Sequence, residues 1–163
     1  MAQQEQGKSR STVPTPKAQL DRFIDKYTPA VGAEGRAALA KLRRLVPGAV
    51  QLVYDNYNFL AVGFGPSERA GEAVLSLAFA PRWIILFFLK NALDLSDPKG
   101  LLRGSGKIVR SIRLTSAKDL DTRPVRALIH EALARADVPI DAKGRGRLII
   151  RSVSAKQRPR RPK

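Results

Sequence analysis

Cysteine is absent from the 163-residue chain, and histidine and tryptophan occur once each. Without cysteine the protein cannot form disulfides, thiolate nucleophiles, iron–sulfur clusters or cysteine-ligated zinc sites. A single histidine cannot build a histidine-rich metal centre, and it leaves little room for a Ser-His-Asp triad. We therefore expect no cofactor and no metal site. The composition favours a non-enzymatic protein, although it does not decide whether a reaction is catalysed.

Long hydrophobic runs are also missing. The longest apolar run, residues 83–89, has seven residues, whereas about 20 are needed to span a bilayer. Residues 1–17 are polar and lack the apolar centre of a signal peptide. We expect a cytoplasmic protein without a membrane segment. Its hydrophobic fraction of 44% is ordinary for a folded domain of this length.

Acidic residues are missing from two segments of this strongly basic chain. The formal net charge is +16, from 30 Lys and Arg against 14 Asp and Glu. Residues 99–113 and 142–163 contain no acid and contribute +5 and +9, so together they supply 14 of the 16 units. The excess charge therefore belongs to one internal segment and one terminal segment, a pattern typical of contact with a polyanion.

Hydrophobic periodicity predicts three helices. The third begins with a cap at Asp121 or Thr122 and has Pro124 in its first turn, where a missing N–H costs nothing. Between the second and third helices, apolar residues alternate or run continuously, as in strands. The predicted helices are 20–27, 34–46 and 122–136, and the predicted strands are 49–54, 59–64, 73–79, 83–89 and 108–114.

This order of elements predicts an α+β domain with two N-terminal helices, an antiparallel sheet of four to five strands and a C-terminal helix packed on the sheet. Residues 83–89 are apolar at every position, which favours a central strand covered on both faces. A second copy of the chain is an alternative cover, so a homodimer stays open. We expect a disordered leader over 1–16, the folded domain over 17–137 and a basic extension over 138–163.

The sequence Gly104-Ser105-Gly106-Lys107 suggests a phosphate-binding loop, because glycines let backbone N–H groups close around an anion. The full P-loop pattern fails, since Leu101 stands where its first glycine belongs and Ile108 where Ser or Thr should follow the lysine. A glycine turn entering a strand is favoured, with anion contact as the alternative. A nucleoside triphosphatase is excluded.

A polar cluster interrupts the strand-forming sequence at residues 54–58. Hydroxyl and amide groups in such a cluster can orient a ligand in a pocket. Asp and Asn equally favour a hairpin turn, and the two interpretations stay open. The candidate pocket residues are Tyr54, Asp55, Asn56, Tyr57 and Trp83.

The basic segments provide the main candidate site. They predict a surface and a tail that engage a polyanion, most plausibly nucleic acid. The alternative is that the tail is only a solvated, self-repelling extension. Few aromatic residues lie near the tail, so sequence-specific recognition of single strands is not expected. The candidate anion-binding residues are Arg103, Gly104, Gly106, Lys107, Arg110, Arg113, Arg151, Lys156, Arg158, Arg160 and Arg161.

Three stretches together resemble the YdhG-like bacterial domains of unknown function: residues 20–27, 47–59, and 100–107 with Ile112-Arg113-Leu114. The ending 151–162 also looks like one seen in a branch of these proteins, and the resemblance as a whole covers roughly residues 18–137. It implies a small α+β domain without an established catalytic activity. Many members carry Tyr-Gly-x-Pro-x-Phe. Here Tyr54 and Phe59 match, but Asp55 and Tyr57 replace the glycine and proline.

Some relatives in that family are described as frataxin-like iron chaperones. Iron binding needs a ridge of carboxylate oxygens, whereas the first helix offers only Asp21 and Asp25. The expected functions are thus, in order, a binding module for an anionic partner, a small-molecule pocket or enzyme around residues 54–59, and iron handling.

Overall fold

In the computed structural model, which describes residues 13–163, two threonines each begin a helix. The Thr15 side chain accepts a hydrogen bond from the backbone N–H of Ala18 (3.2 Å), and the Thr28 side chain accepts one from that of Val31 (3.3 Å). Each threonine is followed by a proline in the first helical turn, where the missing N–H is tolerated. Helix α1 therefore spans Pro16–Asp25 and helix α2 spans Pro29–Leu45.

These caps correct two predicted boundaries. Periodicity predicts the second helix from residue 34, five residues after the observed start at Pro29. The first turn of α2 is poor in large apolar residues, so it gives no periodic signal. The predicted leader ends inside α1, and the rest of that prediction, residues 1–12, lies outside the described residues.

Within residues 13–163, six strands form one mixed sheet in the order β5-β4-β3-β2-β1-β6. The first five pair antiparallel with their neighbours along the chain, and β6 pairs parallel with β1. The α+β class is confirmed, but the sheet has one strand more than predicted and is not wholly antiparallel. The strands are β1 (Val50–Asp55), β2 (Leu60–Gly65), β3 (Leu75–Phe79), β4 (Ile84–Phe88), β5 (Arg110–Leu114) and β6 (Leu148–Val153).

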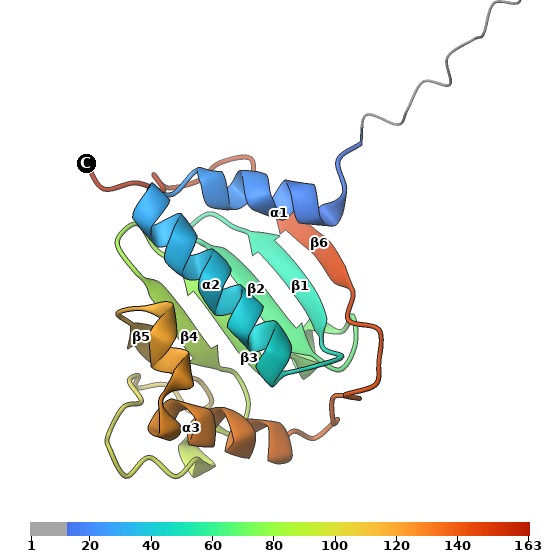
Figure 1. Ribbon diagram of the computed structural model, residues 1–163, viewed down its shortest axis with the longest axis vertical. Coiled ribbons are helices and arrows are strands. Elements are labelled where there is room, and N and C mark those ends of the chain that lie inside the picture. Colours follow the sequence, from blue (N-terminus) through green and yellow to red (C-terminus); the bar gives the residue numbers. More distant parts are fainter. Residues whose placement is uncertain (1–12) are drawn as a thin grey trace, which may run out of the picture.

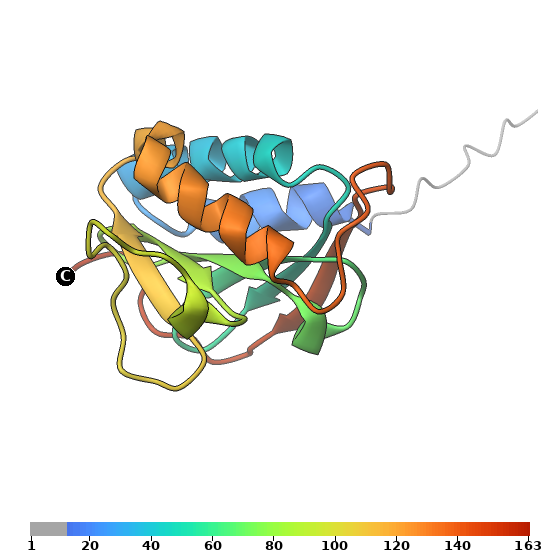
Figure 2. The same ribbon diagram turned by 90° about the horizontal axis from the view of Figure 1, so that it is seen from below.

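The three α-helices of the described part of the chain lie on one face of the sheet (Figure 2), including α3 (Arg123–Ala134), which follows β5 as predicted. Leu39 of α2 and Ile129 of α3 are buried in the same hydrophobic core as Phe64 and Phe79 of the sheet. Short 3₁₀ helices occur in the connections, at Ala70–Glu72, Ala92–Asp94 and Ala117–Asp121. Among residues 13–163, no helix is long and apolar enough to cross a membrane.

Strand β4 is not the central strand that its continuous apolar sequence predicts. It lies second from one edge, between β3 and β5. Ile84, Leu86 and Phe88 are buried, whereas Ile85 and Phe87 are only half-buried. Because the helices cover a single face, the alternate residues of β4 point to the other one. We call this second face the outer face.

The predicted basic extension is also part of the sheet. Residues 148–153 form β6 along β1, and Leu148 and Ile150 pack against the hydrophobic core (Figure 1). Leu148 and Ile150 supply apolar side chains for the helix-covered face. The backbone groups of β6 pair with the edge of β1 that does not face β2. The folded domain therefore does not end at residue 137.

Candidate functional site

A row of exposed aromatic residues stands at one end of the outer face. Leu60 of β2 pairs with Phe79 of β3, which pairs with Ile84 of β4, and all three side chains are buried in the core. Phe59 and Trp83 each come one residue before the strand begins. Continuing the strand alternation places them toward the outer face, at the end of the sheet where Trp83 and Arg113 also line a shallow cavity with Glu34 of α2. The side chains of Phe59 and Trp83 are 38% and 39% exposed, unlike most large apolar residues of the chain.

Each acid-free segment brings one cation to these rings. On β5, Arg113 lies diagonally across from Trp83, with its guanidinium 4.3 Å from the ring centroid. From the C-terminal segment, Arg158 stands over the ring of Tyr57 at 5.6 Å and donates its backbone N–H to the Tyr57 carbonyl (2.8 Å). Cation–π contact of this kind is favourable at a surface. We call Tyr57, Phe59, Trp83, Arg113 and Arg158 the aromatic–basic surface.

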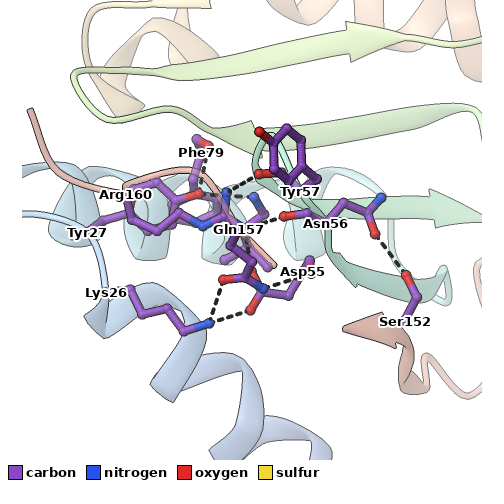
Figure 3. A network of polar contacts seen from close by, with 10 residues as sticks. Lys26, Tyr27, Asp55, Asn56, Tyr57, Phe79, Ser152, Gln157 and Arg160 are labelled. Atoms are coloured by element: carbon purple, nitrogen blue, oxygen red, sulfur yellow. Dashed lines mark hydrogen bonds and ion pairs between the residues drawn. The ribbon is translucent and has the colours of Figure 1, made fainter. Parts of the chain in front are cut away.

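A buried ion-pair network holds the C-terminal segment beside this surface (Figure 3). The Asp55 carboxylate is fully buried and accepts hydrogen bonds from Lys26 Nζ (2.6 Å) and Arg160 Nη2 (2.9 Å). Arg160 also donates to the Asn56 carbonyl (2.5 Å), and Gln157 donates to the Asp55 carbonyl (3.0 Å). These contacts tie residues 157–160 to the turn between β1 and β2.

Tyr27 closes the same network from the helix side. Its hydroxyl donates to the Phe79 carbonyl (2.9 Å) and accepts from the Leu60 N–H (3.0 Å). Burial raises the pKa of Tyr27 above its ordinary value, because the phenolate would lose its hydration. The hydroxyl therefore stays protonated and joins the end of the first helix to the start of β2 and the end of β3.

The structure gives Arg160 a structural role in place of the predicted anion-binding role. The basic tail predicts it to bind an anion, yet it is only 6% exposed and its guanidinium contacts Asp55. A cation held in this way is not free for phosphate. Its neighbour Arg161 is exposed and donates to the carbonyls of Lys26 (3.2 Å) and Asp25 (3.4 Å) at the end of α1, a helix end that favours cations.

The glycine-rich loop is filled by its own arginine. Arg110 donates to the carbonyls of Gly106 (2.5 Å) and Val109 (2.8 Å). Gly104 has a φ of +133°, which favours glycine. The loop thus directs carbonyl oxygens toward the Arg110 guanidinium, which is the geometry of a turn and not of an anion site. Arg103 forms a single β-bridge with Ser111 on the free edge of β5, and Lys107 is exposed.

The two basic segments lie at opposite edges of the sheet. Arg113 belongs to β5 and Arg151 to β6, with four strands between them. Arg151 and Lys156 are exposed, and neither has a carboxylate within ion-pair distance in the described part of the chain. The segments therefore do not form one continuous patch, and each contributes one arginine to an exposed aromatic ring, Arg113 at Trp83 and Arg158 at Tyr57.

The five candidate pocket residues do not converge. Strand alternation places Tyr54 on the outer face, whereas Asp55 is buried beneath the helices. Asn56 accepts a hydrogen bond from Ser152 (2.9 Å), and its N–H donates to the Phe59 carbonyl (3.1 Å), which closes a hairpin turn. A shallow cavity of about 360 Å³ at the end of the sheet is lined by Trp83 together with Glu34 and Arg82. The structure shows a turn at residues 56–59, and Tyr54 and Asp55 belong to the end of β1.

No group of three or more His, Asp or Glu side chains stands close enough to hold a metal ion within residues 13–163. Asp21 and Asp25 of α1 are instead paired with Arg36 of α2.

Comparison with protein-family models, with curated proteins and with solved structures finds no match to this chain.

Phe59 is the site residue that sequence reasoning misses. From the sequence it is predicted to be the first residue of a strand, and it matches the phenylalanine of the Tyr-Gly-x-Pro-x-Phe pattern. The signal is the pair Phe59-Leu60, since two consecutive residues of a strand point to opposite faces. With Leu60 in the core, Phe59 must lie on the outer face.

Proposed function

We propose that the protein is a non-enzymatic binding module whose anionic partner is a nucleic acid. The observation that carries the proposal is a row of exposed aromatic rings between Arg113 and Arg158, neither of which has a carboxylate partner among residues 13–163. Arginines supply phosphate contacts, and aromatic rings offer faces on which bases stack. A polyanion without bases would contact the arginines but would leave the aromatic rings without a role.

The distribution of ion pairs supports this choice. On the helix layer, Arg36, Lys41 and Arg126 are each paired with an aspartate. Arg22 and Arg44 of the helices also lack an acidic partner in the described residues, but in the two acid-free segments such cations are grouped: Arg103, Lys107, Arg113, Arg151, Lys156 and Arg158. Unpaired cations raise the local concentration of an anionic ligand and speed its association. We also propose that the chain is related to the YdhG-like domains, but this resemblance does not indicate which partner the protein binds.

The test is binding of a labelled oligonucleotide, followed by fluorescence anisotropy at increasing NaCl. With about five phosphate contacts, the slope of log K against log salt is near −4.5 for a duplex and near −3.5 for a single strand. The variant Lys107→Gln/Arg113→Gln/Arg158→Gln should bind at least about tenfold more weakly. Its slope should be shallower by about 1 for each phosphate-binding cation that is removed.

The matched control removes three exposed charges from the first two helices, as Lys17→Gln/Arg22→Gln/Arg44→Gln. It lowers the net charge equally but should leave affinity within about threefold, because screening weakens distant charges. Binding that ignores salt would overturn the proposal. So would equal weakening in the two triple variants, since this would indicate an unlocalised attraction.

A further inference from the structure

We propose that the aromatic–basic surface binds single-stranded nucleic acid, with Phe59 and Trp83 stacking on unpaired bases. This inference rests on the proposed function and specifies its substrate. Duplex DNA offers stacked, inaccessible base faces, whereas single strands can splay their bases onto aromatic side chains. The surface has the features that this second mode requires.

The spacing of the rings suits a single strand. Phe59 precedes β2 and Trp83 precedes β4, with β3 between them. Neighbouring strands are about 4.8 Å apart, so the two backbone positions are separated by about 10 Å. Antiparallel sheets that bind RNA use such rings to stack two or three bases.

The floor between the rings is low. The outward-facing positions at this end, Ala78 of β3 and Ala80 just after it, carry only methyl groups, and so does Ala61 of β2. Ala78 and Ala80 are themselves buried. Across this part of the sheet, Phe59 and Trp83 themselves are therefore the accessible apolar groups, and the methyl groups of Ala78 and Ala80 are not.

Arg113 extends the stack over Trp83. Its guanidinium lies 4.3 Å from the indole centroid, and the plane of an arginine can itself stack on a base. At the other end of the row, Arg158 sits by Tyr57, whose side chain is 44% exposed. Cations at both ends give the phosphate backbone a partner wherever the strand enters or leaves.

Charge favours nucleic acid over a second copy of the chain. Apposing two such surfaces would bring Arg113 and Arg158 of each copy against those of the other, and like charges at an interface are costly. The five residues of the aromatic–basic surface include no carboxylate. Of the nearby carboxylates, Asp55 is buried and already paired, and Glu34, in the cavity beside Trp83 and Arg113, accepts the Ala117 N–H (2.6 Å). Nothing on this surface would neutralise a basic partner.

The experiment compares a short oligothymidylate with a duplex of equal length. Phe59→Leu and Trp83→Leu keep an apolar side chain at these partly buried positions but remove the aromatic face. Each should weaken single-strand binding by about tenfold and leave duplex affinity within about twofold, since phosphate contacts are retained. Leu93→Ala, which alters an exposed apolar residue on the 3₁₀ helix Ala92–Asp94, is the matched control and should change neither.

Trp83 also reports binding directly, because it is the single tryptophan of the chain. Oligothymidylate should quench its fluorescence, whereas inorganic polyphosphate, which has no bases, should not. Quenching that appears only with oligothymidylate supports the inference, and equal quenching by both would count against stacking.

The outcomes separate this inference from the proposed function. If both leucine variants bind single strands normally while the Lys107→Gln/Arg113→Gln/Arg158→Gln variant does not, the stacking role is wrong and nucleic-acid binding stands. If the unaltered protein binds neither oligonucleotide, both fail. If sedimentation shows a dimer that Trp83→Leu dissociates, the surface is an interface between copies and the inference is overturned.

Discussion

Asp55 shows how one residue holds distant parts of the chain together. Its buried carboxylate joins Lys26, at the end of α1, to Arg160, which lies 105 residues further along the chain than Asp55. Removing one partner of a buried pair leaves an uncompensated charge away from water. The network thus makes the C-terminal segment part of the fold.

We expect Arg160→Ala to lower the free energy of unfolding by about 3–5 kcal/mol, because Asp55 would keep only Lys26 as a counter-charge. Urea denaturation followed by circular dichroism measures the change. Arg161→Ala is the control: Arg161 is exposed and contacts only backbone carbonyls, so its cost should stay below about 1 kcal/mol. Similar stabilities of the two variants would contradict a structural role for Arg160.

At the scale of elements, α2 crosses β3 at a position without a side chain. A Cβ on Gly35 would lie 1.9 Å from Cε2 of Phe79, so the helix approaches the sheet more closely than alanine allows. On the same helix, a Cβ on Gly32 would meet first the flexible end of Arg36, at 3.2 Å. Two glycines that look alike in the sequence therefore have different surroundings.

Gly35→Ala should destabilise the protein by about 1–3 kcal/mol, because Phe79 or α2 must shift. Gly32→Ala is the matched control and should be neutral or stabilising by up to about 1 kcal/mol, since alanine is the better helix former. Chemical denaturation midpoints measure both. If both variants gain stability, the close approach of α2 to β3 is refuted.

For the whole molecule, the excess of positive charge opposes the compact state. The net charge is +16, and the unpaired cations of β5, β6 and the C-terminal segment share the outer side and edges of one sheet. Self-repulsion of this kind destabilises folded chains and is screened by salt.

The thermal unfolding midpoint should therefore rise as NaCl increases from about 0.05 to 0.5 M. The variant Lys107→Gln/Arg113→Gln/Arg158→Gln should unfold at a higher temperature in low salt and gain less from added NaCl. Differential scanning calorimetry measures both. A midpoint that falls with salt would show instead that attractive ion pairs dominate.

The whole molecule also changes how the tail is tested. From the sequence, deletion of residues 142–163 is the direct test of a basic tail in nucleic-acid binding. That deletion would remove β6 and leave Asp55 without Arg160, so a loss of binding would not separate a missing phosphate partner from misfolding. Substitutions at Lys107, Arg113 and Arg158 make the test specific.

Local sequence patterns predict most helices and strands well, but they do not predict which elements lie next to one another in the sheet. Alternation in residues 73–79 and the start of α3 depend on adjacent residues. A strand does form there, from Leu75 to Phe79, and α3 does begin after Thr122, although the Thr122 side chain makes no capping hydrogen bond. The predicted position of β4 is wrong, because an apolar run does not say how many helices cover a sheet. The candidate site is predicted in part: the cations and Trp83 are named, whereas Phe59 is missed and Arg160 is misassigned.

The sequence by itself determined the α+β class, the helices, the first five strands and the concentration of positive charge in two segments, because periodicity, caps and composition act over a few residues. Only the tertiary structure decided that residues 148–153 join the free edge of β1, that Arg160 is buried against Asp55, and that Arg113 and Arg158 stand at either end of one aromatic row. These arrangements depend on which strand edge is unpaired and which face of the sheet the helices do not cover. Both are properties of the folded protein and not of any local stretch of sequence.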